Sequence, residues 1–193
     1  MEQGEAQTGY SAADTFEVEK IHPVSNTSLV WGLAGVVDPA VAFAEWLGDL
    51  RAATWEDLKV LATAEVAKIN HEIRAPVRAA MGLAPGMSSG PFVVQGVSVL
   101  IAGYVGGRAG VLTVSDLGQP ESFHDSRPHF LGPYASTARV SWVTVQRFVS
   151  GLDLAEPSVF RRLFEGVSDT VAGLYLPVSL WRVSPNVSPE KIH

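Results

Sequence analysis

Apolar and polar residues alternate along residues 15–24, and a short apolar run rich in strand-forming residues follows at 28–34. Alternation with a period of two is typical of a strand that buries one face, so both segments are predicted to be strands. Pro23, Ser25 and Asn26 lie where the first segment meets the second and predict a hairpin turn. The chain is therefore expected to contain two antiparallel strands before its first helix.

Two helices are predicted next, because the spacing of apolar residues changes. Asp38 followed by Pro39 is typical of a helix start, and apolar residues then recur at three-residue steps over 41–50. Thr54 and Asp57 have the spacing of a capping box, in which each side chain accepts a hydrogen bond from a backbone N–H of the other residue. The apolar stripe beyond them predicts a long helix that is interrupted or ends near Pro76: Leu58, Leu61, Ala62, Ile69 and Ile73.

Glycine, proline and serine at 82–90 predict a loop, and strands are expected after it at 92–103 and 110–114. The nearly continuous apolar run at 97–102 indicates a sheet that is covered on both faces. The remaining predicted elements are a short extended piece near Phe123, helices over 132–148 and 157–171, a closing strand over 175–183 and a loose tail over 185–193.

This order of elements, strands then helices then strands then helices then a strand, predicts an α+β protein. Two sheet segments and two helix pairs fit a four-layer αββα sandwich, with the sheets inside and the helices outside. No internal repeat or long linker divides the chain, so a single domain over 1–184 with a flexible tail over 185–193 is expected.

Composition narrows the classes of partner and location. The chain has 193 residues, 47% of them hydrophobic, which is enough for one sizeable core, and its net charge is -6. A negative chain with scattered basic residues argues against nucleic acid and anionic membranes as partners. The absence of cysteine excludes disulfides, thiolate metal ligands and a cysteine nucleophile. No apolar run approaches the ~18 residues of a membrane span, and no secretory signal is evident, so a cytoplasmic location is expected.

Five short motifs occur in an order that resembles the proteasome β-subunit family of N-terminal-nucleophile hydrolases. They are Lys20-Ile21 with the run Gly32-Leu33-Ala34-Gly35, the run 100–104, the run 110–116 followed by Gly118, the run 132–135 and the closing segment 175–183. The resemblance covers residues 5–183 and implies the same four-layer fold. It also implies amide-bond hydrolysis of threonine-peptidase type, with a peptide as substrate and no cofactor.

The resemblance assigns roles to particular residues. Lys20 matches the lysine whose ammonium lowers the pKa of the attacking group, and the backbone N–H of Gly35 matches the donor to the oxyanion. Gln7, Thr8 and Gly9 fall where the family pairs with the substrate backbone, although Gln7 replaces the usual threonine. Asp169 lies about two residues early for the family's supporting aspartate, by the spacing of the motifs.

Nineteen residues precede Lys20, whereas the family carries its threonine nucleophile on a strand farther ahead of this lysine. We therefore expect the chain as written to lack that strand and its nucleophile, and to be inactive; Thr8 is a poor substitute. A non-catalytic ring-forming or scaffold subunit that self-associates through its outer helices is the alternative, and an unrelated soluble binding domain is the third. Without the resemblance, Lys20 is a surface lysine, Gly35 is a turn residue, and His124 and His129 lie in a plain loop.

Overall fold

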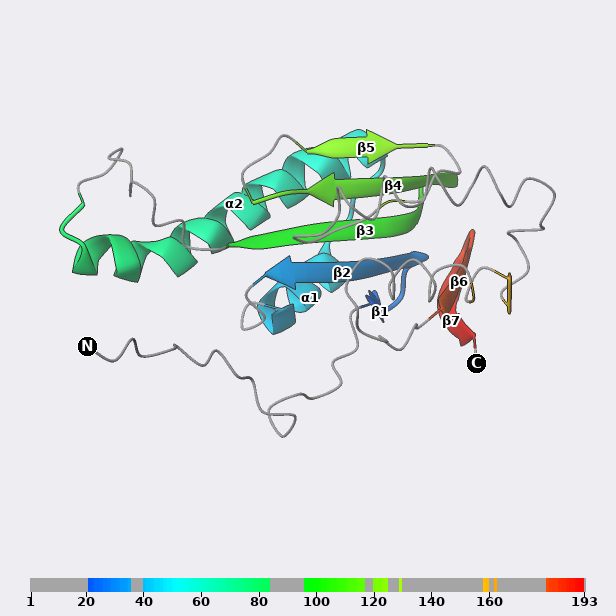
Figure 1. Ribbon diagram of the computed structural model, residues 1–193. Coiled ribbons are helices and arrows are strands. Elements are labelled where there is room, and N and C mark those ends of the chain that lie inside the picture. The colour runs from blue at the N-terminus through cyan, green and yellow to red at the C-terminus, as the bar shows by residue number, and fades with distance from the viewer. Residues whose placement is uncertain are drawn as a thin grey trace, which may run out of the picture.

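The computed structural model describes residues 21–35, 40–83, 96–116, 120–124, 129, 158–159, 162 and 180–192. Within these ranges the strands are β1 (Ile21–Pro23), β2 (Leu29–Gly35), β3 (Val97–Val105), β4 (Arg108–Val114), β5 (Glu121–Phe123), β6 (Leu180–Ser184) and β7 (Val187–Ile192). The helices with defined bounds are α1 (Ala40–Asp49) and α2 (Trp55–Ala80). Strands β1 to β5 form one sheet in sequence order, each antiparallel to its neighbours, and β6 pairs with β7 (Figure 1). The predicted α+β class is confirmed.

One face of the five-stranded sheet packs against the helices and forms the core. Trp31 on β2 pairs with Ile101 on β3, and Ile101 pairs with Leu112 on β4, so these three side chains lie on the same face. Helix α2 packs on β3, β4 and β5, while α1 contributes Phe43 to the same cluster. The largest fully buried side chains of this core are Phe43, Leu47, Leu58, Val66, Val97, Val99, Ile101, Leu112 and Val114.

The opposite face of the sheet is also apolar. Val30 pairs with Ala102, and Ala102 pairs with Val111, so the three residues lie side by side on the face that points away from the core. Leu100 shares that face, and Val30 is only 7% exposed. The sheet therefore carries apolar residues on both faces at these positions, which is typical of a sheet covered on both sides.

Helix α2 begins as the sequence predicts and ends later than expected. Thr54 and Asp57 form the predicted capping box, with each side chain accepting from the other residue's backbone N–H. The expected interruption or end near Pro76 is not observed, because the helix continues through this residue to Ala80. It stops at Gly82, whose φ of +65° permits the hydrogen bonds that close the last turn, Gly82 N–H to Ala79 and Leu83 N–H to Arg78.

Several sequence expectations are shifted or corrected by the structure. Strand β3 covers 97–105, so it runs two residues beyond the expected end at 103, while 92–95 lie outside the described residues. The turn that follows it is Gly106-Gly107, both with positive φ. The loose tail expected over 185–193 is wrong, because residues 187–192 form β7 and pair with β6. A turn centred on Asn186, at φ +58°, joins the two strands. The helices expected over 132–148 and 157–171 fall almost entirely outside the described residues, and the extended piece at Phe123 is β5.

The β6–β7 hairpin lies beside one end of the large sheet, next to β2 and β3 (Figure 1). The backbone N–H of Val187 donates to the Ser28 hydroxyl at 3.2 Å, which links the hairpin to the start of β2. Among the helices in the described ranges, none combines the length and apolar character that a bilayer crossing requires.

Candidate polar site at the Gly35 end of the sheet

The structure positions one of the predicted site residues. Gly35 is the last residue of β2, while Lys20, Gln7, Thr8 and Gly9 lie outside the described residues. The backbone of Gly35 has a φ of +109°, a conformation that favours glycine. A β-carbon at this position would lie 2.0 Å from the carbonyl oxygen of Gly96, so only glycine fits there. Gly35 thus ends a strand, where the sequence alone predicts a turn residue, and its backbone conformation requires glycine.

The pairing of β2 with its neighbours determines where the Gly35 N–H points. Tyr104 N–H donates to the Ser28 carbonyl at 3.0 Å, so Ser28 and every second residue after it form hydrogen bonds with β3. Gly35 is an odd number of positions from Ser28 and pairs with Val97 as a non-hydrogen-bonded partner. On the other side, Leu29 accepts from Val24 N–H at 2.9 Å, and Gly35 lies an even number of positions from Leu29. The Gly35 N–H is therefore directed away from β3, toward the β1 side of β2.

A buried amide side chain lies directly beside this strand end. Asn70, on α2, is 2% exposed. Its Nδ2 donates to the Val97 carbonyl at 3.0 Å, and its Oδ1 accepts from the Val97 N–H at 2.6 Å. Both polar groups of one backbone residue are thus satisfied by one carboxamide, which removes the cost of burying Asn70 without a partner.

A partly buried ion pair continues this polar cluster. The Arg74 guanidinium, on the next turn of α2, pairs with the Asp116 carboxylate, and their side chains are 24% and 16% exposed. The second carboxylate oxygen of Asp116 accepts from the Gly96 N–H at 3.0 Å. The Asp116 N–H in turn donates to the Ser98 hydroxyl at 3.0 Å. The cluster therefore holds the start of β3, the end of β4 and α2 in one arrangement.

These contacts fit a structural role better than a chemical one for the cluster itself. The Asn70 amide and the Asp116 carboxylate are engaged with neighbouring groups. The backbone donor at Gly35, by contrast, faces the side on which β1 lies. Sequence analysis missed Asn70 and Arg74, although a polar Asn70 on the apolar stripe between Ile69 and Ile73 was a signal that could have been used.

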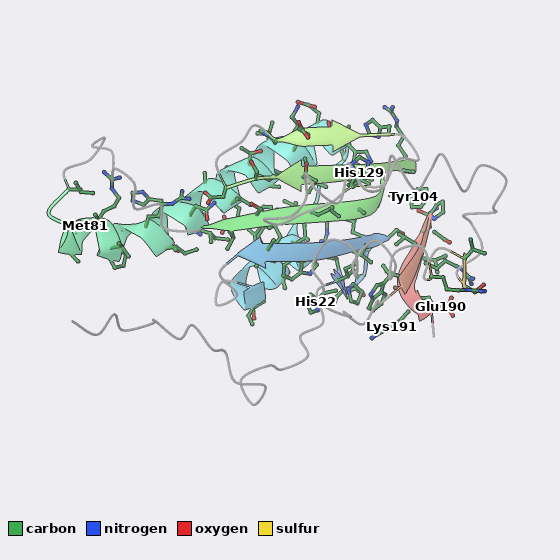
Figure 2. All side chains as sticks on the ribbon, in the orientation of Figure 1. His22, Met81, Tyr104, His129, Glu190 and Lys191 are labelled. Atoms are coloured by element: carbon green, nitrogen blue, oxygen red, sulfur yellow. The ribbon has the colours of Figure 1, made fainter. Side chains whose placement is uncertain are left out.

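A second candidate site lies at the opposite end of β2. A pocket of about 550 Å³ lies between the turn before β2, the α1–α2 connection, the β3–β4 turn and the β6–β7 turn. Tyr104 and Arg51 line it, and Figure 2 shows Tyr104 at the hairpin end of the sheet, far along the molecule from Met81 at the end of α2. Arg51 already donates to the carbonyls of Gly48 and Leu50 at 3.1 and 3.0 Å. The pocket is thus separate from Gly35. The basic side chain that lines it, Arg51, is hydrogen-bonded to carbonyls at the end of α1.

Metal ligation gains no support from the described ranges, where no three His, Asp or Glu side chains gather closely enough to hold an ion. His124 instead contacts the Ala109 carbonyl through Nδ1 at 2.9 Å and lies against Trp55, with ring centroids 6.1 Å apart. His124 thus directly follows β5, where the sequence predicts a plain loop, and its ring has partners in β4 and α2.

Comparison with models of known protein families found no match, and comparison with curated proteins found none. The function is therefore argued from the residues and their geometry.

Proposed function

We propose that the protein has a proteasome-like, four-layer αββα fold and is related to threonine-type peptidases. The Gly35 end of β2 corresponds to their amide-hydrolysing site, and the chain as written is inactive because Met1 offers no attacking nucleophile. Two features support the fold. The sheet is antiparallel with helices on one face, and its other face carries Val30, Leu100, Ala102 and Val111, which a second sheet would cover.

One observation carries the choice of site. The Gly35 N–H is a backbone donor whose direction is set by the strand pairing, and it points away from β3. Oxyanion stabilisation in acyl transfer needs such a donor, fixed in place before the charge develops. Gly35 meets this requirement, because its approach to Gly96 leaves little room for displacement toward β3.

The remaining roles follow from the resemblance. Ile21 pairs with Gly32, so a β1 strand continued by one residue would bring Lys20 opposite Leu33, two positions from Gly35. Its ammonium would then lie near the oxyanion donor, where a positive charge favours the deprotonated form of an attacking hydroxyl or its amine base. Gln7, Thr8 and Gly9 are proposed to pair with the backbone of a peptide substrate, and the reaction needs no cofactor.

The test is hydrolysis of fluorogenic peptides by the protein expressed from its complete reading frame. We expect Lys20→Ala to lower kcat by about a hundredfold or more, because the charge that tunes the attacking group is lost. Lys59→Ala is the matched control, since Lys59 forms only a partly exposed pair with Glu56 on α2, at 3.6 Å. Activity that survives the Lys20 change would remove the proposed mechanism.

A non-catalytic ring-forming or scaffold subunit is the second candidate, favoured by apolar side chains on the outer helix surfaces. Val41 is 69% exposed, Val60 is 62% exposed and Leu61 is 42% exposed. Exposed apolar residues on adjacent helices are typical of a surface that another protein covers. If this candidate is right, the protein sediments as a particle larger than a monomer and hydrolyses no peptide, and Val60→Glu dissociates it. Val187→Glu, at a 58% exposed site on β7, is the control.

A further inference from the structure

We propose that Asn70 and Asp116 act together as a positioning clamp for the Gly35 amide. The inference rests on the proposed function, because it gives these two residues a task at the same site. The clamp does not touch the reacting groups. It fixes the position of the Gly96 and Val97 backbone, and that backbone limits where Gly35 can lie.

Strand pairing sets the direction of the Gly35 N–H, but Gly35 itself forms no hydrogen bond to β3. Gly35 and Val97 face each other as a non-hydrogen-bonded pair, so the Gly35 N–H and the N–H of Val97 do not join the two strands at this point. The distance between Gly35 and the start of β3 is therefore limited by steric contact. The position of its missing β-carbon lies 2.0 Å from the Gly96 oxygen and 3.3 Å from the Val97 Cα. A displacement of the Gly96–Val97 backbone therefore transmits directly to Gly35.

Side chains hold that backbone from the side opposite to Gly35. Asn70 binds both the N–H and the carbonyl of Val97, at 2.6 and 3.0 Å. Asp116 accepts from the N–H of Gly96 at 3.0 Å and is itself oriented by the Arg74 guanidinium. Three backbone polar groups on two consecutive residues are thus bound by side chains rather than by a neighbouring strand.

The chemistry of the clamp requires a carboxamide at position 70. A backbone N–H needs an acceptor and a carbonyl needs a donor, and a carboxamide supplies both on adjacent atoms of one planar group. A β-carbon on Gly96 would lie 2.3 Å from the Asn70 Oδ1, so the backbone is in close contact with the amide. An apolar residue would pack equally well on this stripe of α2. The amide is therefore explained by its hydrogen bonds, which position the Val97 backbone, and not by burial alone.

The clamp can be tested on Gly35 directly by NMR, without any enzymatic activity. Protein labelled with ¹³C-carbonyl alanine and ¹⁵N-glycine gives one amide signal for each Ala-Gly step, and the chain has four of them, ending at Gly35, Gly103, Gly110 and Gly173. Ala34→Ser removes the Gly35 signal and so assigns it. Gly103 pairs with both Leu29 and Gly110 at the far end of the sheet, and these two glycines serve as internal controls.

Asn70→Asp is the informative variant, because it keeps the shape and one acceptor while removing the donor to the Val97 carbonyl. We expect the Gly35 signal to shift and its amide hydrogen exchange to accelerate by about tenfold, while the Gly103 and Gly110 signals stay in place. Asp116→Asn is expected to act in the same direction and more weakly. Thr63→Val is the matched control, since it removes a hydrogen bond from the same helix, Thr63 Oγ1 to the Lys59 carbonyl at 2.6 Å, away from Gly96.

The results separate this inference from the proposed function. A Gly35 signal that stays unchanged in both clamp variants overturns the clamp, and so does an equal shift of all the assigned glycines, which would indicate general loosening. If the wild-type protein hydrolyses peptides, Asn70→Asp is expected to lower kcat about tenfold with little change in KM, because a displaced oxyanion donor acts in the transition state. If no hydrolysis occurs, the NMR result still decides the clamp, and only the proposed function fails.

Discussion

At each end of the β2–β3 pair, a glycine lies very close to a backbone carbonyl. The two glycines are supported in different ways. Gly35 faces the Gly96 carbonyl at one end and Gly103 faces the Ser28 carbonyl at the other, and in each case a β-carbon would lie 2.0 Å from the oxygen. Both glycines have positive φ, +109° and +143°. The backbone thus approaches equally closely at the two ends.

The support at the Gly103 end combines turns with a contact between residues distant in sequence. Asn26 and Gly106 adopt positive φ in the turns that flank it, and Thr54 caps the start of α2 close by. Trp55 donates through Nε1 to the Arg108 carbonyl at 2.8 Å, across 53 positions. At the Gly35 end, side chains bind the backbone at the start of β3, with Asn70 reaching Val97 across 27 positions. Turns with positive φ thus flank one end, whereas the other end relies on Asn70 and Asp116 bound to the backbone of Gly96 and Val97.

The largest expected effect comes from adding a methyl group at either glycine. Gly35→Ala and Gly103→Ala each place a β-carbon into a backbone carbonyl and force a residue with a β-carbon into a positive φ. We expect each to lower the free energy of unfolding by more than about 3 kcal/mol, measured by chemical denaturation. Gly48→Ala on α1 is the control, because nothing lies within 4 Å of its β-carbon position, and it is expected to stabilise by up to about 1 kcal/mol. Tolerance of either strained variant would contradict the close approach.

The next effect is specific to the Gly35 end. Asn70→Ala removes two hydrogen bonds and leaves the buried Val97 backbone groups without that partner. We expect a loss of about 2–4 kcal/mol in the free energy of unfolding. Thr63→Ala, which removes one local hydrogen bond on the same helix, is expected to cost about 0.5 kcal/mol. Equal losses for the two variants would show that Asn70 has no special part in supporting this end.

Removing a charge at the Gly35 end is expected to have a smaller effect on the free energy of unfolding. Asp116→Asn removes the charge that pairs with Arg74 but keeps an oxygen for the Gly96 N–H. Because this ion pair is partly buried, its loss is expected to cost about 1–2 kcal/mol, between the values typical of exposed and buried pairs. Glu190→Gln is the control, since its pair with Arg182 at 3.7 Å has side chains 71% and 60% exposed and is expected to change stability very little. A similar loss in both variants would remove the contrast between the two environments.

The sequence predicts the local features of this fold well. The capping box at Thr54, the helix at 41–50 and the hairpin before β2 all follow from residues within a few positions of each other. The nearly continuous apolar run at 97–102 fits the apolar residues found on both faces of the sheet, and cover on the second face stays a prediction. The prediction was wrong at 187–192, because prolines and polar residues there were taken to exclude a strand, whereas an edge hairpin accommodates Pro189.

The candidate site was only partly predictable, because the residues that form it are far apart in the sequence. Gly35 could be singled out from its own motif. Asn70, Arg74 and Asp116 meet only after α2 packs on the sheet, and no short spacing connects them. The polar Asn70 within an apolar stripe is a signal that a buried partner exists, which our sequence analysis did not use, and it does not indicate which partner.

The smallest expected effect tests whether the two ends are independent. Thr54→Ala removes the side-chain cap of α2 near the Gly103 end and is expected to cost about 1 kcal/mol. Because Asn70 lies more than four helical turns beyond this cap, the clamp at the Gly35 end should be unaffected. The NMR signal of Gly35 is therefore expected to stay in place, while that of Gly110, which packs against Trp55, shifts. A shift of Gly35 in this variant would mean that α2 transmits changes as one rigid rod, and that the two ends of the sheet are supported jointly.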